Sequence, residues 1–292
     1  MIIRFFFISF LLLKFVPATH CQEQALFLFT CEKDRAGYKV SQPKLLSDFI
    51  PDGAFSDPHF INHDWLLIIH SHEKMSDVYQ MNLESRTIMR LTGTPEIEYC
   101  PQKNPGEASF SCVIGDTVQF TGSSLWAYPE DLKNGGREIY SHLQPILSYS
   151  WLNDSLIAAV VGEDLLELHL INVNTLSSKL ISTQVNTCVK KDESGNLLFL
   201  NQYGALHWFV KKVNATTGKI EIIKKGPERA DVLEILDNGN IIMGAQHRLF
   251  ALHKESNDWV EIADLSQWGI HKIIQMAYNG SDKLALTVLL DH

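Results

Sequence analysis

The chain has 292 residues, of which 45% are hydrophobic and 20% are charged, a composition typical of one large globular domain or two smaller ones. Its formal net charge of -9 argues against binding to nucleic acid, which requires a basic face, and against binding to an anionic membrane surface. The composition does not determine the fold, so the fold has to be inferred from the order of the residues.

The N-terminal segment, residues 1–21, is predicted to be a secretory signal peptide. One arginine, Arg4, precedes an almost wholly apolar run at 5–16, and mostly small residues follow around Ala18. The run is too short to predict a membrane span. We therefore expect the mature chain, 22–292, to be exported to the periplasm or the extracellular space without an integral membrane segment. Lipid anchoring at Cys21 is the alternative, although His20 is a poor fit to the small residue that such processing prefers.

The clearest pattern along the chain lies between residues 57 and 101. An apolar run at 65–69 is followed by an alternating run at 77–83 and, after a short turn, by a third run at 86–92. Short β-rich runs separated by turn residues predict an antiparallel meander. One meander cannot bury both of its faces, so it needs neighbours of the same kind.

The rest of the chain supplies such neighbours at a regular spacing. A polar turn before or inside a strong apolar strand recurs near His63, Gly115, Asn153, Ser194, Asn238 and Gly280, with separations of 52, 38, 41, 44 and 42 residues. A period of roughly 40 to 45 residues built from short strands is typical of a β-propeller. The sequence therefore predicts an all-β fold of four-stranded antiparallel blades.

The two ends of the chain each lack part of a unit. The C-terminal unit has two predicted strands, at 272–277 and 284–290, and the mature N-terminus has two more, at 25–31 and 38–46. If the N-terminal strands complete the C-terminal blade, the ring closes and the exposed sheet edges disappear. Five whole blades and one composite blade give a six-bladed β-propeller over residues 22–292.

The first full unit resembles the repeat of the TolB-like β-propeller family. The residues that carry the resemblance are Asp57, Pro58, Phe60, Asp77, Tyr79, Leu91 and Thr92. Later units keep only fragments of the pattern, such as Asn153-Asp154 and Asp237-Asn238-Gly239. The resemblance implies an exported member of the family that consists of the propeller alone.

The same unit contains four histidines within fourteen residues: His59, His63, His70 and His72. Histidine is the commonest metal ligand, and two residues that are two apart project from the same face of a strand. The four are therefore candidate ligands of a divalent metal. The alternative, which we favour, is that they are solvated or cap turns in polar loops, so that no metal or other cofactor is expected.

The cysteines can be interpreted in two ways. Cys100 and Cys112 flank a turn-rich segment and form the most plausible disulfide of an exported chain. Buried free thiols in strands are an equal alternative.

Function is less well determined than fold. A rigid ring can hold a protein, peptide or glycan on its loops or at the mouth of its central channel, so we expect a non-catalytic, monomeric binding scaffold with a protein or peptide partner. The alternative is a propeller-type lyase or hydrolase with a histidine or metal site at the channel. The position of the four histidines distinguishes the two.

Overall fold

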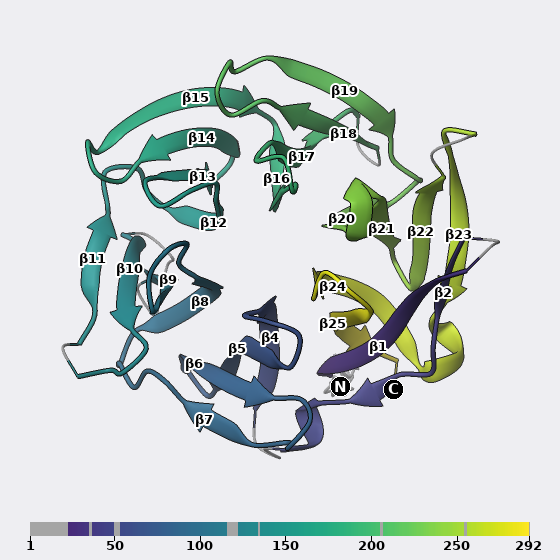
Figure 1. Ribbon diagram of the computed structural model, residues 1–292, viewed down its shortest axis with the longest axis horizontal. Helices are drawn as coiled ribbons and strands as arrows, with labels where there is room; N and C mark the ends of the chain where they lie inside the picture. The colour runs from purple at the N-terminus through teal and green to yellow at the C-terminus, as the bar shows by residue number, and fades with distance from the viewer. Residues whose placement is uncertain are drawn as a thin grey trace, which may run out of the picture.

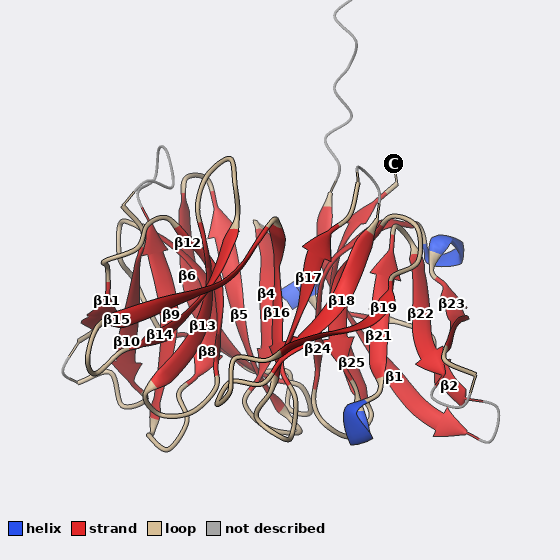
Figure 2. Ribbon diagram, turned by 90° about the horizontal axis from the view of Figure 1, so that it is seen from above, coloured by secondary structure: helices blue, strands red, loops and turns tan. Residues whose placement is uncertain are grey.

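The computed structural model describes residues 23–34, 37–49, 53–115, 122–133, 135–204, 207–253 and 256–291. The predicted signal peptide and Cys21 lie outside these residues. Within them the chain forms β-strands and three short 3-10 helices, and its sheets stand side by side around a central axis (Figure 1). Most strands run from one face of this ring to the other (Figure 2). No helix in the described ranges is long and apolar enough to cross a membrane.

The two ends of the chain share one sheet. It has the order β2–β1–β25–β24, and β3 also pairs with β1. Its strands are β1 (Gln24–Asp34), β2 (Gly37–Val40), β3 (Lys44–Leu45), β24 (Ile270–Tyr278) and β25 (Lys283–Leu290). The register of β1 against β25 runs from Gln24 opposite Leu289 to Thr30 opposite Lys283. The predicted closure of the ring by the N-terminal strands is therefore confirmed.

An eight-stranded sheet follows. It consists of two antiparallel four-stranded runs, joined by a single parallel bridge between Ser76 and Ile97. The first run comprises β4 (Ala54–Phe60), β5 (Trp65–His72), β6 (Met75–Asn82) and β7 (Ile88–Arg90). The second comprises β8 (Ile97–Lys103), β9 (Ser109–Gly115), β10 (Ser124–Pro129) and β11 (Arg137–Tyr140). The strands predicted at 65–69, 77–83 and 86–92 correspond to β5, β6 and β7.

Three further sheets each have four antiparallel strands in chain order. The first contains β12 (Ile146–Trp151), β13 (Leu156–Val161), β14 (Glu167–Asn172) and β15 (Ser177–Thr183). The second contains β16 (Val185–Lys191), β17 (Leu197–Gln202), β18 (Trp208–Val213) and β19 (Ile220–Lys225). The third contains β20 (Ala230–Ile235), β21 (Ile241–Ala245), β22 (Arg248–His253) and β23 (Asp258–Asp264). The short helices are η1 (Ser47–Phe49), η2 (Asp237–Gly239) and η3 (Ser266–Trp268).

The hydrophobic core lies between neighbouring sheets. On one face of the β16–β19 sheet, Phe199 and Val213 pack with Leu170 of the preceding sheet. On its other face, Leu200 and Val210 belong to the cluster that reaches into the following sheet. Strands such as β13 and β17 are covered on both faces, which explains why they are continuous apolar runs. The outermost strands β15 and β19 are mostly exposed.

Candidate ligand site in the central channel

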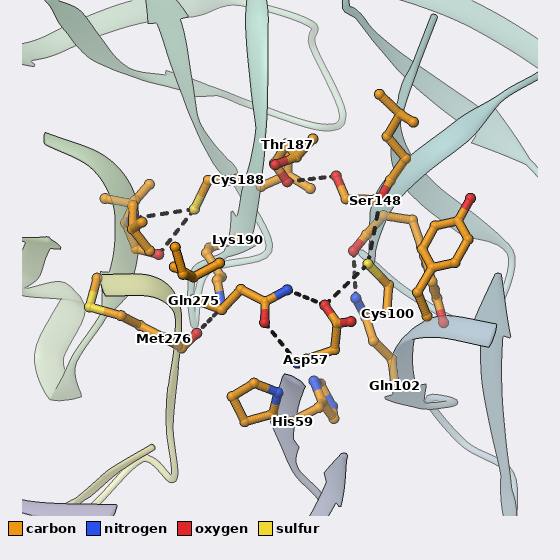
Figure 3. A pocket seen from close by; sticks show the side chains of 18 of the residues that line it. Asp57, His59, Cys100, Gln102, Ser148, Thr187, Cys188, Lys190, Gln275 and Met276 are labelled. Carbon is orange, nitrogen blue, oxygen red and sulfur yellow. Dashed lines mark hydrogen bonds between the residues drawn. The ribbon is translucent and has the colours of Figure 1, made fainter. Parts of the chain in front are cut away.

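The innermost strands of the ring enclose a cavity of about 430 Å³ on the central axis. Strands β4, β8, β12, β16, β20 and β24 each contribute lining residues, and Figure 3 shows their side chains around a common opening. This cavity is the one to which all six inner strands contribute. Rings of inner strands are common places for ligands in closed β-structures.

Asp57 joins the first inner strand to the last. Its backbone N–H donates to Gln275 Oε1 at 2.7 Å, and its carboxylate accepts a hydrogen bond from Gln275 Nε2. A register irregularity between Ser56 and His59, with a positive φ of 49° at Asp57, accompanies this position in the channel. Burial raises the pKa of Asp57, although its hydrogen bonds oppose that shift.

Cys100 occupies a similar irregularity on β8, with a positive φ of 52°. Its thiol lies 3.8 Å from Asp57 Oδ1 and donates to the Leu147 carbonyl oxygen at 3.6 Å. Burial, followed by the charge of Asp57, raises the pKa of this thiol well above its usual value. A thiol held in this way is a poor nucleophile, because the thiolate is the reactive form.

Lys190 is the cation of the channel. Its ammonium group donates to Glu234 Oε2 at 2.6 Å and to the Met276 carbonyl oxygen at 2.9 Å, so that it links β16, β20 and β24. Burial by itself would lower the pKa of Lys190, but the charge of Glu234, the hydrogen bond to it and the nearby Cys188 and Cys100 together raise the pKa. The positive charge is therefore already neutralised within the protein.

Further side-chain hydrogen bonds also link neighbouring inner strands. Ser148 donates to the Thr187 carbonyl oxygen at 2.6 Å, and Asn186 donates to the Asp231 carbonyl oxygen at 2.7 Å. Cys188 Sγ donates to the Leu233 carbonyl oxygen at 3.1 Å, and burial raises the pKa of its thiol to about 11. Most polar side chains of the channel thus connect one sheet to the next.

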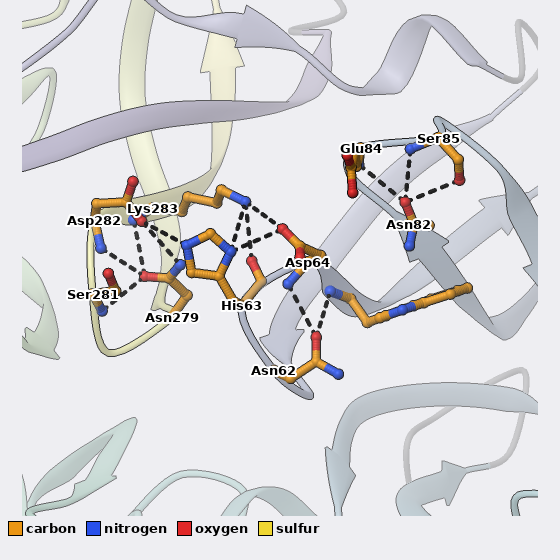
Figure 4. Close-up of polar contacts among 11 residues, drawn as sticks. Asn62, His63, Asp64, Asn82, Glu84, Ser85, Asn279, Ser281, Asp282 and Lys283 are labelled. Atoms are coloured by element: carbon orange, nitrogen blue, oxygen red, sulfur yellow. Dashed lines mark hydrogen bonds and ion pairs between the residues drawn. The ribbon is translucent and has the colours of Figure 1, made fainter.

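The four candidate histidines do not lie together at one site. His59 lines the channel, where burial and then the charge of Lys190 lower its pKa to about 4, so the ring is neutral at physiological pH. His63 lies on the exposed loop between β4 and β5, 2.8 Å from Asp64 Oδ1 and 3.2 Å from Asp282 Oδ1 (Figure 4). His70 is buried and packs beside Phe55, and His72 is exposed at the end of β5.

Since these histidines occupy a channel, a loop, the core and a strand end, they offer no common ligand set. Within the described residues no group of three or more histidine, cysteine, aspartate or glutamate side chains could hold a metal ion.

The expected disulfide between Cys100 and Cys112 is not formed. Both are free thiols, as are Cys31 and Cys188. Cys100 lines the channel, whereas Cys112 is buried in the cluster that contains Phe110 and Tyr128. The register irregularity on β8 accounts for the failure, because it places Cys100 outside the cluster that encloses Cys112. The structure agrees with the alternative of buried free thiols.

The remaining residues of the TolB-like repeat lie around the first run of the eight-stranded sheet. Pro58 lines the channel beside Asp57, and Phe60 packs on the cluster that contains Phe55 and Leu66, as does Tyr79. Asp77 pairs with Arg90 at 2.7 Å.

Leu91 packs against the cluster around Val78, and Thr92 Oγ1 accepts the Val78 N–H at 2.8 Å while donating to the buried Glu98. These contacts hold β6 to β8 and are structural.

Comparison with solved structures agrees with this architecture. A structure titled as a putative TolB from Agrobacterium tumefaciens matches 92% of this chain and 100% of its own, with a TM-score of 0.64 and 10% sequence identity. The fold is that of a TolB-like β-propeller. The nidogen/laminin complex also matches with a TM-score of 0.64, at 9% identity, over 87% of this chain and 98% of that one. A puromycin hydrolase S511A mutant matches with a TM-score of 0.61 at 11% identity, over 91% of this chain and 49% of that one.

At these identities the likeness establishes the fold of the propeller and not its activity. No family model matches the sequence, and no curated protein matches it.

The channel was only partly foreseeable from the sequence. Asp57 and His59 stand in the repeat that the sequence singles out, but Cys100 was assigned to a disulfide, and Lys190, Cys188 and Gln275 were not singled out. Their shared signal is a polar residue within the first strand of each repeat, since that strand becomes the innermost one.

Proposed function

We propose that this propeller is a non-catalytic scaffold that binds a protein, peptide or glycan at the mouth of its central channel. The observation that carries the proposal is the state of the channel groups. Lys190 is paired with Glu234, the thiols of Cys100 and Cys188 have raised pKa values, and His59 is neutral. Such a site offers a shaped, largely preorganised surface and no activated nucleophile.

The finer description of the scaffold is part of the same proposal. Counting each four-stranded run of the eight-stranded sheet as a blade gives six blades, which the pairing of β1 with β25 supports. We further propose that the chain is monomeric and is exported after loss of residues 1–21, with lipid anchoring at Cys21 as the less favoured form. The apolar run at 5–16 supports export.

A protein partner is favoured over a small molecule by analogy of fold. One similar propeller was solved in a nidogen/laminin complex, so a propeller of this shape can be part of a protein complex. The opposite proposal, a lyase or hydrolase built on the histidines, has less support because His59 is the only one of the four histidines among the residues that line the channel.

The test is a pull-down from the native compartment with a channel variant. Thr187→Trp places a bulky ring at an exposed channel position, and Glu84→Trp places the same ring on an exposed outer turn as the matched control. We expect the wild-type chain and Glu84→Trp to retain the same partner and Thr187→Trp to lose it. Retention of the partner by Thr187→Trp would contradict binding at the channel.

A further inference from the structure

The β16–β19 sheet differs in charge from the rest of the molecule. Residues 185–225 carry seven lysines against three carboxylates, a net charge of +4, within a chain whose net charge is -9. The remainder therefore carries -13. A basic region of this size on an acidic protein can attract an acidic partner while the rest of the surface repels it.

The strand register shows which face holds the basic side chains. Phe209, Lys211 and Val213 alternate along β18 and lie opposite Lys225, Ile222 and Ile220 of β19. Val213 packs with Leu168 and Leu170, so this face is turned toward the β12–β15 sheet. Lys179 of β15 lies opposite Leu170 and shares the gap between the two sheets.

We call this surface the lysine face; it consists of Lys179, Tyr203, Phe209, Lys211, Ile220, Ile222 and Lys225. Strands β15 and β19 lie next to each other along the outer rim of the ring (Figure 1). The ammonium of Lys179 reaches the β18–β19 turn, because a Cβ built on Gly218 would lie 3.1 Å from it. The lysine face is therefore one continuous surface over two sheets.

The lysines of this face have no carboxylate partner among the residues that the structure describes. None of the ion pairs formed by the described residues includes Lys179, Lys211 or Lys225. The opposite face of the same two strands behaves differently. There Lys212 pairs with Asp192 at 3.1 Å and Lys224 pairs with Asp258 at 3.5 Å.

Apolar and aromatic side chains are interleaved with these cations. Ile222 is 62% exposed and Ile220 is 39% exposed. Tyr203 is 60% exposed, and its ring lies 5.1 Å from that of Phe209. The lysine face therefore combines exposed apolar groups with cations, a combination that suits an amphipathic partner.

The backbone of β19 is also available. It is the last strand in the order β16–β17–β18–β19, so within the described chain one of its edges has no partner strand. An unpaired edge presents N–H and C=O groups that an extended peptide can use to add a strand.

We propose that the lysine face and the free edge of β19 bind an acidic, extended segment of a partner protein, which adds to this sheet as a fifth strand. Backbone hydrogen bonds to β19 supply the pairing. Two apolar residues of the segment cover Ile222 and Ile220, which are neighbours on this face of β19. Carboxylates on either side of them meet Lys225 at one end and Lys179, near Gly218, at the other, and Lys211 lies one strand further in, opposite Ile222. This surface lies on the outer rim and is separate from the channel mouth.

The test uses fluorescence anisotropy with protein expressed from the full sequence. The probe is a labelled peptide, Glu-Thr-Val-Thr-Val-Thr-Glu, which places two valines between two glutamates on one face of a strand. Two control peptides are measured in parallel. One has lysine in place of each glutamate, and the other has alternate backbone nitrogens methylated. We expect the acidic peptide to bind about tenfold more tightly than either, since charge and ladder hydrogen bonds both contribute.

Variants locate the binding surface. We expect Lys211→Glu with Lys225→Glu to weaken binding about tenfold and Ile222→Thr to weaken it about fivefold. Lys39→Glu with Lys44→Glu makes the same change in charge at exposed positions of β2 and β3 and is the matched control, with a change below about twofold. A thermal midpoint equal to that of the wild type shows that each variant is folded.

Three results would overturn the proposal. Equal weakening by the control variant would mean that the peptide responds only to net charge. Unchanged binding of the methylated peptide, together with displacement by heparin, would identify a site for anionic glycans. Binding to vesicles of anionic lipid but not to the peptide would identify a membrane-facing surface.

Discussion

Lysine side chains have opposite surroundings in the central channel and on the lysine face. In the channel, Lys190 lies 2.6 Å from Glu234 and also donates to a backbone carbonyl oxygen. On the outer rim, Lys211 and Lys225 have no carboxylate partner among the described residues. A buried cation must be compensated because its desolvation is costly, whereas an exposed cation is solvated and remains available to a partner. The lysine of the channel therefore links neighbouring sheets, whereas the lysines of the rim are free to meet the acidic partner that we propose.

The largest expected difference between the two regions concerns stability. Lys190→Ala leaves the buried carboxylate of Glu234 without its cation, so we expect the free energy of unfolding to fall by about 3 kcal/mol. The double variant with Glu234→Gln should recover more than half of this loss, because no uncompensated charge remains. Urea unfolding measures both. A loss below about 1 kcal/mol for Lys190→Ala would show that channel water already solvates the pair.

The second difference concerns thiol chemistry. Cys188 has a pKa of about 11 against an ordinary value of 9.0, so its thiolate fraction at pH 8 is about a hundredfold lower than that of an unperturbed thiol. A cysteine placed on the lysine face by Ile222→Cys provides the exposed comparison. We expect iodoacetamide to modify it about a hundredfold faster than Cys188 in the native protein, as followed by peptide mass. Equal rates would contradict a thiol protected by the channel.

The third difference concerns pH. The pKa of His59 is about 4 in the folded protein and 6.5 ordinarily, so the unfolded chain binds the proton more tightly between these values. The contribution of a neutral His59 to stability is complete above pH 6.5 and is lost as the pH falls through 4.

Because the side chain is partly exposed to the channel, we expect this contribution to be about 2 kcal/mol, below the full value of the shift. The His59→Gln variant should show a correspondingly flatter pH dependence in urea unfolding between pH 7 and 4. The exposed His72→Gln is the control and should keep the wild-type slope.

The smallest effect is expected on the rim. Lys211→Ala and Lys225→Ala remove a half-exposed and an exposed cation that have no ion-pair partner in the described part of the chain, so each should change the free energy of unfolding by less than about 0.5 kcal/mol. Thermal unfolding at low and high salt measures this. A larger loss that disappears in salt would show that these lysines stabilise the fold through the acidic remainder of the chain.

The strands were the most predictable part of the molecule. Runs such as Trp65–His72 and Leu156–Val161 show apolar patterning that depends only on neighbouring residues. The closure by β1 was also predictable, because two surplus strands at each end of the chain complement each other. These signals are local in sequence, and each of the repeated units shows them again.

The candidate site was less predictable, because its residues are close in space and distant in sequence. Asp57 and Gln275 are 218 residues apart and share two hydrogen bonds. The four histidines show the opposite case, since they are close in sequence and separate in the fold. Proximity in sequence was therefore misleading for chemistry.

The sequence by itself determined that this protein is a ring of short antiparallel strands, because side-chain alternation and turn spacing are properties of consecutive residues. Only the tertiary structure decided which polar residues meet. The irregularities in β4 and β8, with positive φ at Asp57 and Cys100, accompany the entry of these residues into the channel. The register of β18 against β19 likewise decides that Lys211 and Lys225 share a face with Ile222. A shift of one residue would reverse that arrangement, because neighbouring side chains of a strand point to opposite faces.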